Sequence, residues 1–241
     1  MVQIMDSTSP SENLTEVPRA MQTYVMPPRI WHETSTQTDA EVFEHAFNVL
    51  IHSNQYSSGK PLGMGIWNLE SLAHDRDYGT QLMQSEPLEH LLVLARTNVG
   101  WQIRQCAARV IGSSLWNNPE AMEVARDSHL LVKLFDILKH ENHSGVKASL
   151  IFAMSAAAHV SADDLDQFMD EAGSQYLRES FEHGNAEVKG KCATFVQDNL
   201  LHTFNVEKRA QEMPEWCNTL QRSLINDTAD GAAEKVLECL M

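Results

Sequence analysis

The chain has 241 residues, of which 43% are hydrophobic, and a formal net charge of −15 at pH 7. This acidity argues against nucleic-acid binding, because phosphate contacts require clustered Lys and Arg side chains, and it argues equally against an anionic membrane surface. The longest apolar run, residues 148–160, is shorter than the roughly 20 residues that a membrane-spanning helix needs. The composition is compatible with a solvated protein that binds another protein.

Residues 1–38 are rich in Ser, Thr and Pro and have no hydrophobic period, which predicts a disordered or loosely attached tail. They contain neither a basic n-region nor an apolar h-region, so we expect no secretory signal in the chain as given. The rest of the chain is expected to be helical, because Gly is sparse and no run alternates with the two-residue period of a strand.

The sequence after the tail repeats at intervals of 42 or 43 residues. Leu-rich helical segments that begin near His90, Lys133 and Tyr176 are each followed by a loop and a longer helix. The four long helices are predicted at residues 59–74, 100–115, 144–159 and 185–202. Short polar helices, predicted at residues 78–84, 119–127 and 162–171, separate the units. Pro119 suits the first turn of its helix, and Ser161 is typical of an N-cap.

Three helices per unit with a period near 42 are typical of armadillo or HEAT repeats. We therefore predict an all-α fold: a right-handed superhelical solenoid of about four three-helix repeats over residues 39–212. Residues 213–241 are predicted to form two helices that cap its open end. The alternative is an irregular helix bundle. Such a bundle would not predict that two sets of equivalent positions in the four long helices recur at a constant interval.

The aligned long helices give two columns of candidate partner-binding residues on a concave face. The first column is Trp67, Arg109, Phe152 and Phe195, and the second is Ser71, Ser113, Ala156 and Asn199. His74 shares one helix face with the first member of each column. Trp67 and Phe152 fit a core position equally well, whereas a contact is favoured for Arg109 because a buried unpaired Arg is costly. Gly112 is expected to be a helix-packing position.

No catalytic, cofactor or metal site is predicted, and we do not expect an enzyme. His140 and His143 lie in a loop without a third ligand nearby. The acidic residues between 163 and 171 lack the Gly of a calcium loop. No nucleophile elbow is present, and the four Cys residues are scattered, which is typical of thiols rather than of a disulfide framework.

Four consecutive segments carry a resemblance to a known family: QCAARVIGSSLWNNPEAMEV, LLVKLFDILKHE, VKASLIFAMSAAAHV and EVKGKCATFVQDNLL. They resemble the armadillo-type nucleotide exchange factors of heat-shock protein 70 chaperones, well over residues 60–202 and more weakly at 40–59 and 214–241. The resemblance implies a monomer that binds the chaperone one to one. It also implies that the concave face wraps one lobe of the chaperone's ATPase domain, so that ADP leaves without any chemistry by the factor.

The resemblance is compatible with two cellular compartments. Asn118-Pro119 and Trp216-Cys217 look more like the branch of the endoplasmic reticulum lumen, with a BiP-like partner, whereas the absence of a signal peptide favours the cytosolic branch. The alternative function is that of a generic armadillo or HEAT-repeat adaptor, although the second column lacks the Asn ladder of peptide-binding adaptors. The segment YLRESFEHG is unusually polar for the family, which puts the packing of the C-terminal half in doubt.

Overall fold

The computed structural model describes residues 37–53, 59–97, 99–200 and 206–226. The predicted tail therefore lies outside the described residues apart from its last two positions, and so do residues 227–241 of the predicted cap. Every regular element in the described ranges is helical, which confirms the all-α class. None of the helices described is at once long and apolar enough to cross a membrane.

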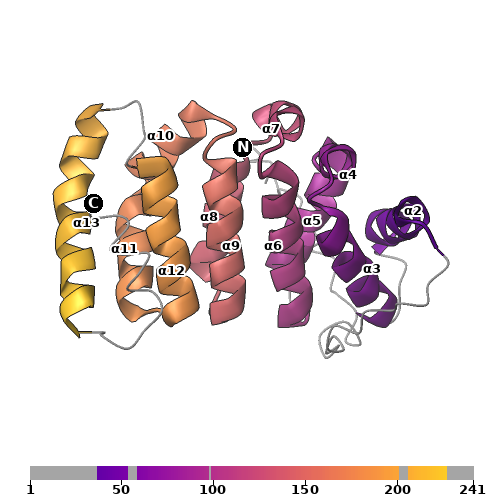
Figure 1. The fold of residues 1–241 in the computed structure, drawn as a ribbon, viewed down its shortest axis with the longest axis horizontal. Coiled ribbons are helices and arrows are strands. Elements are labelled where there is room, and N and C mark those ends of the chain that lie inside the picture. Colours follow the sequence, from indigo (N-terminus) through magenta and orange to yellow (C-terminus); the bar gives the residue numbers. More distant parts are fainter. Residues whose placement is uncertain (1–36, 54–58, 98, 201–205, 227–241) are drawn as a thin grey trace, which may run out of the picture.

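The helices follow one another with short connections (Figure 1). Their bounds are α2 Asp39–Ile51, α3 Gly59–Leu72, α4 Arg76–Leu82, α5 Ser85–Arg96, α6 Trp101–Leu115, α7 Pro119–Ala125, α8 Leu130–His140, α9 Ser144–Ala157, α10 Ala162–Asp170, α11 Gly173–His183, α12 Ala186–Phe195 and α13 Val206–Asn226. A 3₁₀ turn, Arg126–Ser128, follows α7, and a π-helical turn, Val196–Leu200, follows α12.

Local capping explains why several helices begin where the sequence predicts. Thr38 and Glu41 form a reciprocal capping box at the start of α2. Asn118 caps α7, with Pro119 in the first turn, and Ser161 accepts a hydrogen bond from the backbone of Asp164 at the start of α10. Both N-terminal predictions are confirmed.

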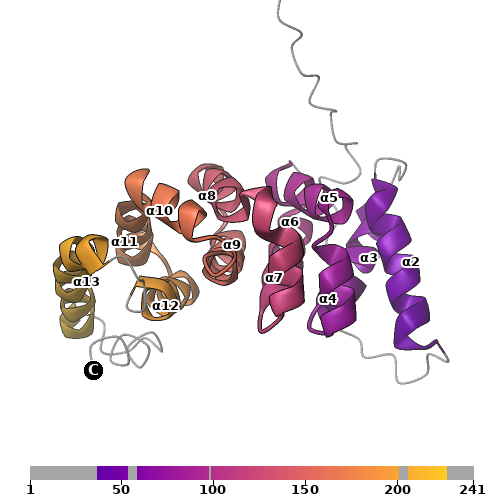
Figure 2. The ribbon, with the colours of Figure 1, turned by 90° about the horizontal axis from the view of Figure 1, so that it is seen from above.

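The helices pack in two layers along the molecule. The four long helices α3, α6, α9 and α12 lie side by side toward the viewer in Figure 1, and each packs against the next. The Leu-rich helices α5, α8 and α11 pack behind α6, α9 and α12. Figure 2 shows this from above, with α8 and α11 on one side and α9 and α12 on the other. The short helices α4, α7 and α10 occupy the upper edge in Figure 1.

The Leu-rich helices supply much of the core between the layers. Leu91 of α5 and Leu134 and Leu138 of α8 are completely buried. Full burial of one such side chain stabilises the fold by about 1.5–3 kcal/mol. Phe135 and Phe168 continue this core toward the C-terminal end, where their rings meet edge to face with centroids 4.9 Å apart.

The polar residues of α11 hold the last helix. The Ser174 hydroxyl donates to the Glu212 carboxylate over 2.6 Å and accepts from the Trp216 indole N–H over 2.9 Å. Arg178 forms an ion pair with the same carboxylate. Trp216 is completely buried, and its ring packs against Phe181. The unusual polarity of this segment therefore serves a specific contact with α13.

The predicted boundary at residue 213 falls inside a helix. Helix α13 runs without a break from Val206 to Asn226, through Pro214. Glu212 and Trp216, which lie on either side of that boundary, both contact α11. The end of the repeat region is therefore not marked by a loop at this position.

Candidate partner-binding surface

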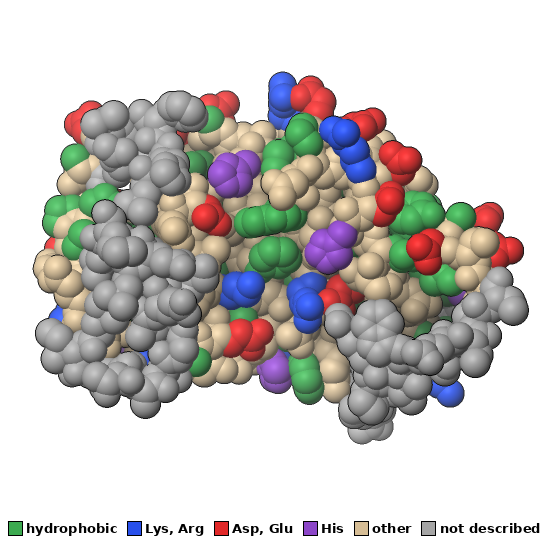
Figure 3. Space-filling view, viewed as in Figure 1, with side chains coloured by type: hydrophobic (Ala, Val, Ile, Leu, Met, Phe, Trp, Pro, Cys, Tyr) green, Lys and Arg blue, Asp and Glu red, His purple; other side chains and the backbone are tan. Residues whose placement is uncertain are grey.

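The long helices present a mixed surface at the front of the molecule. We call the side formed by α3, α6, α9 and α12, which faces the viewer in Figure 1, the front face. Figure 3 shows hydrophobic side chains at its centre, between α6 and α9, with basic side chains just below them. This is the region in which the sequence predicts partner-binding residues.

Trp116, which caps α6, and Lys191 of α12 both contact the ring of Phe152 on α9, and we call these three side chains the central patch. The rings of Trp116 and Phe152 have centroids 6.2 Å apart, within the range of favourable aromatic pairs. The Lys191 ammonium lies 4.9 Å from the centroid of the Phe152 ring, in the geometry of a cation–π contact. Trp116 is 46% exposed. Exposed aromatic rings beside a cation are typical of protein-binding hot spots.

The backbone around Gly112 shapes this patch. A Cβ atom at Gly112 would lie 2.5 Å from Cε1 of Phe152 and 3.1 Å from the Cα of Ala153. The missing side chain therefore lets α6 and α9 approach closely and seats the Phe152 ring. Helix α6 ends at Leu115, its C-cap Trp116 is extended, and Asn117 follows in the left-handed region with a φ of 54°. The prediction that Gly112 is a packing position is confirmed.

Arg109 is held at the surface by an acid beneath it. Its Nη2 atom lies 2.7 Å from Oε1 of Glu70 on α3, and the Cys106 thiol donates to the other carboxylate oxygen over 3.4 Å. The Arg109 side chain is 43% exposed, whereas that of Glu70 is only 7% exposed. A buried carboxylate requires such partners, because an unpaired charge in the interior is costly. Glu70 thus fixes where the guanidinium stands.

A second aromatic pair marks the lower edge of the front face. The rings of Trp101 and His143 are stacked with centroids 4.4 Å apart. Beside them, Arg104 donates to the buried Glu141 carboxylate through Nε and Nη2, over 3.0 and 3.2 Å. Burial alone raises the pKa of Glu141, but hydrogen bonds from the His143 N–H, from Arg104 and from the Asn142 N–H outweigh it and hold the pKa below the ordinary value.

Comparison with known proteins identifies the family. The family model described as nucleotide exchange factor SIL1 matches residues 39–241. This chain belongs to the SIL1 family. The match begins at the first residue of α2 and covers all the described helices.

Curated relatives of this SIL1-family chain are distant and longer. Nucleotide exchange factor SIL1 of Xenopus laevis is 28% identical over 228 residues, which cover 86% of this chain and 49% of that protein. Nucleotide exchange factor Sil1 of Drosophila melanogaster is 23% identical over 163 residues, which cover 66% of this chain and 38% of that protein. An uncharacterized protein of Schizosaccharomyces pombe is 20% identical over 210 residues, which cover 78% of this chain and 62% of that protein. The chain thus spans 38–62% of the length of these relatives, and no solved structure matches it.

The predicted columns divide into surface and core in this SIL1-family fold. Ser71 and His74 are exposed, and Trp67 and Phe152 are half-buried. His74 lies beyond the last residue of α3 rather than on the helix. Phe152 belongs to the central patch, and Arg109 lies on α6, which packs against the helix that carries Phe152.

Four predicted contact residues are instead buried, which corrects the expectation that both columns face solvent. They are Ser113, Ala156, Phe195 and Asn199. Phe195 is completely buried and packs against the Phe168 ring, with centroids 5.5 Å apart. The Asn199 amide donates to the Ser155 hydroxyl over 3.0 Å and to the Phe195 carbonyl oxygen over 3.1 Å. Three members of the second column, Ser113, Ala156 and Asn199, therefore lie between helices, whereas its first member, Ser71, is exposed.

The fourth long helix differs from the prediction in its helix type. It was predicted as a single α-helix over residues 185–202, but the α-helix ends at Phe195 and a π-helical turn follows. Asn199 lies within this turn, which has more residues per turn and so shifts its angular position. Phe195 precedes the turn and is buried because it packs against the Phe168 ring. Lys191 and Glu70 were missed because their contacts cross between helices, and no spacing within one helix indicates such contacts.

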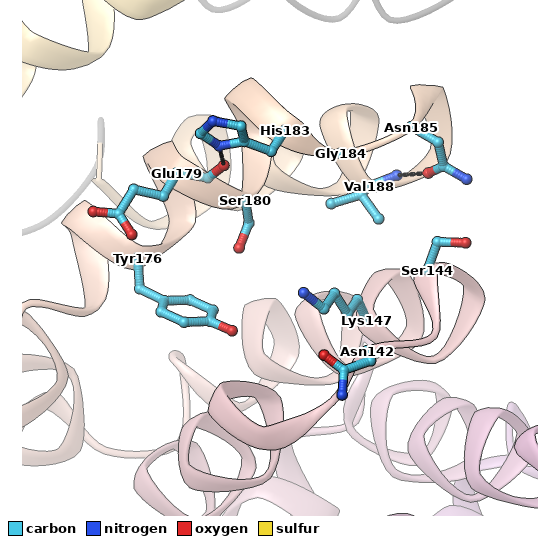
Figure 4. Close-up of a pocket in the computed structure, with 10 residues that line it drawn as sticks. All are labelled: Asn142, Ser144, Lys147, Tyr176, Glu179, Ser180, His183, Gly184, Asn185 and Val188. Atoms are coloured by element: carbon cyan, nitrogen blue, oxygen red, sulfur yellow. Dashed lines mark hydrogen bonds between the residues drawn. The ribbon is translucent and has the colours of Figure 1, made fainter.

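A polar hollow, which none of the three residues of the central patch lines, is shown in Figure 4. It has a volume of about 330 Å³ and is lined by α9, α11, the turn between α11 and α12, and the start of α12. Tyr176 donates from its wall to the Leu138 carbonyl oxygen over 3.1 Å. Burial, with the Glu179 carboxylate nearby, raises the pKa of Tyr176. In the described ranges, no three His, Cys, Asp or Glu side chains are placed to hold a metal ion.

Proposed function

We propose that this chain is a nucleotide exchange factor that binds the ATPase domain of a heat-shock protein 70 chaperone through its front face and promotes ADP release. The observation that carries this proposal is the match of residues 39–241 to the SIL1 family. The printed names of the Xenopus and Drosophila relatives support the exchange activity. The exposed Trp116 and half-buried Phe152 support a protein partner at this face.

The proposed architecture is an armadillo-like solenoid of about four three-helix units. The recurrent order of Leu-rich, long and short helices supports it, together with the packing of each long helix on the next. Such a stack offers a broad, rigid face without needing a pocket. A rigid face suits a factor that must hold one lobe of a partner in place.

The proposed mechanism is a shift between conformations of the chaperone. The factor binds the open, nucleotide-poor arrangement of the ATPase domain more tightly than the closed one. If the binding free energies of the factor for the two arrangements differ by about 1–3 kcal/mol, binding of the factor would lower the chaperone's affinity for ADP by roughly 5–150-fold. By the same linkage, bound ADP weakens binding of the factor. No residue of the factor takes part in chemistry, so we propose that it is not an enzyme.

We propose that the partner is the BiP-like chaperone of the endoplasmic reticulum lumen and that one factor binds one chaperone. The lumenal features Asn118-Pro119 and Trp216-Cys217 support this choice over the cytosolic branch.

The test is the release of labelled ADP from purified lumenal and cytosolic chaperones, with the full chain added at stoichiometric concentration. We expect faster release from the lumenal chaperone and a one-to-one complex by analytical ultracentrifugation. Binding without faster release would indicate an adaptor instead. No acceleration with either chaperone would contradict the exchange activity.

A further inference from the structure

The polar hollow contains a half-buried cation that has no anionic partner in the fold. Lys147 extends from α9, and Figure 4 shows its ammonium group directed into the space that the lining residues enclose. Within the part of the chain that the structure describes, Lys147 takes part in no ion pair. A charge that is partly removed from water is normally paired, so an anion from outside the chain would complete this site.

Two helix N-termini add positive potential to the hollow. Helix α9 begins at Ser144, α12 follows its N-cap Asn185, and both residues line the hollow. A helix N-terminus carries a partial positive charge and backbone N–H groups that lack a partner within the helix. The N-cap of α9, His143, makes no side-chain hydrogen bond to these groups. The hollow therefore combines a full positive charge with backbone donors, which suits an anion.

The wall of the hollow also contains one acid, Glu179, which does not neutralise the cation. Glu179 is exposed, and its carboxylate accepts a hydrogen bond from the side-chain amide of Gln175 over 2.9 Å. Water screens the charge of an exposed carboxylate, so it acts on the hollow more weakly than the half-buried ammonium group of Lys147 does.

The rim of the hollow offers groups that match a peptide backbone. Asn142 in the turn before α9 and Asn185 before α12 are both exposed. An Asn side chain donates and accepts hydrogen bonds, as a peptide group does. The side-chain oxygen of Asn185 accepts from the Val188 N–H, which leaves its NH₂ group for another acceptor. The volume of about 330 Å³ lies at the lower end of the range of ligand pockets, about 300–1,000 Å³, and so suits a single side chain.

From this arrangement we propose that the hollow binds the carboxylate of an Asp or Glu side chain in a peptide segment of another protein. The carboxylate accepts hydrogen bonds from Lys147 and from the first-turn N–H groups of α9. Peptide groups on either side of the acidic residue bind Asn142 and Asn185. This site is separate from the central patch, and the inference does not depend on the proposed function.

The test uses the full chain and two small probes that differ in charge. N-acetyl-aspartate N-methylamide carries a carboxylate between two peptide groups, and N-acetyl-asparagine N-methylamide is its neutral counterpart. The affinities are measured by NMR titration from the backbone amide shifts of Asn142, Ser144 and Asn185. We expect the aspartyl probe to bind about fivefold more tightly or better, since hydrogen bonds to charged groups are the stronger ones. Equal affinities, or no shifts at these amides, would overturn the proposal.

Removal of the cation is the second measurement. Lys147→Gln should weaken binding of the aspartyl probe by about tenfold, because it removes a charged hydrogen-bond donor. Lys60→Gln makes the same change in net charge at an exposed position of α3, a helix that contributes no residue to the lining of the hollow, and is the matched control. If the two variants bind the probe equally well, the proposal is wrong.

Removal of the acid should have the opposite sign. Glu179→Gln takes away a like charge and should tighten binding of the aspartyl probe by about twofold. Because Glu179 is exposed, this variant decides the result if the melting curve of Lys147→Gln shows that it unfolds. In that case, unchanged or weaker binding by Glu179→Gln overturns the proposal.

Titration with the full-length chaperone identifies the source of the carboxylate. Weaker chaperone binding by Lys147→Gln than by Lys60→Gln would place the acidic residue on the chaperone, whereas equal binding would place it on a different protein. A wild-type chain that binds the aspartyl probe selectively but does not accelerate ADP release would support this site and contradict the proposed function.

Discussion

Gly112 of α6 provides the space that the Phe152 ring of α9 occupies. A single Cβ atom at residue 112 would come within 2.5 Å of that ring. The packing of α6 against α9 and the position of one patch residue therefore depend on the same missing side chain. We therefore expect stability and the proposed partner binding to be linked at this point.

Replacing Gly112 with Ala tests this link. The added methyl group has to displace the Phe152 ring or push α6 away from α9, and overpacking of this kind typically costs about 1–3 kcal/mol. We expect a lower midpoint of urea unfolding, together with weaker chaperone binding. The measurements are urea denaturation followed by circular dichroism and a binding titration.

Gly190 of α12 is the matched control. A Cβ atom there would meet nothing within 4 Å, and the residue lies inside a helix. Gly190→Ala should therefore stabilise the protein by up to about 1 kcal/mol through helix propensity. If both substitutions shift the midpoint in the same direction, the packing role of Gly112 is wrong.

The buried pair of Arg104 and Glu141 predicts a pH dependence of stability. Because the pKa of Glu141 in the folded protein lies below the ordinary value of 4.5, the ionised carboxylate stabilises the fold. This contribution is fully present above about pH 4.5 and is lost as the pH falls through the lower folded pKa. Glu141→Gln should lower the free energy of unfolding by about 1–3 kcal/mol at pH 7. The difference in this free energy between the variant and the wild type should become smaller in acid.

The exposed pair of Lys133 and Glu89 is the control for this prediction. Its charged atoms lie 3.3 Å apart, and the Glu89 side chain is 61% exposed. Glu89→Gln should change the free energy of unfolding by less than about 1 kcal/mol, as is usual for surface ion pairs. A Glu141→Gln effect that stayed constant down to pH 3 would count against the lowered pKa.

The Ser174 hydroxyl group connects two of the contacts that attach α13 to α11. Ser174→Ala removes the acceptor of the buried Trp216 indole and a donor to Glu212, and an unsatisfied buried polar group costs about 1–3 kcal/mol. We expect faster amide hydrogen exchange in α13 with little change in α6 and α9. Ser180→Ala on the same helix, at the wall of the polar hollow, should leave the exchange of α13 unchanged.

The cysteine residues should differ in their reactivity. Burial raises the pKa of the Cys192 thiol far above its ordinary range, whereas Cys217 is only half-buried. Because the thiolate is the reactive form, a thiol reagent should modify Cys217 in the native protein and reach Cys192 only after unfolding. The measurement is mass spectrometry of labelled peptides in a Cys239→Ser background. Rapid native labelling of Cys192 would contradict the buried environment.

The sequence predicted the helices more accurately than the surface. The repeat interval located every long helix, because the positions of Leu and of the capping residues are local properties of the chain. Asn199 was assigned to the surface because the alignment assumed one constant helical phase, which the π-helical turn changes. Phe195 was assigned to the surface because its contact with Phe168 of α10 crosses between helices.

The sequence also did not predict which residues on different helices contact each other. Arg109 was correctly singled out as an unusual residue, but its partner Glu70 lies on the preceding long helix. Lys191 has no distinguishing pattern in the sequence, and its position over the Phe152 ring becomes visible only in the structure. Such contacts depend on how one helix is rotated against the next, which periodicity does not determine.

The polar attachment of α13 also limits how this protein can change length in evolution. Ser174 and Arg178 occupy the repeat positions at which the two preceding units carry Leu88 and Leu131, and Leu92 and Phe135. Those four side chains are buried apolar residues. A duplicated internal unit inserted after α11 would meet a hydroxyl and a guanidinium group where it needs a hydrophobic neighbour. We therefore expect that a duplicated unit added at this end would pack stably only if both positions were also substituted.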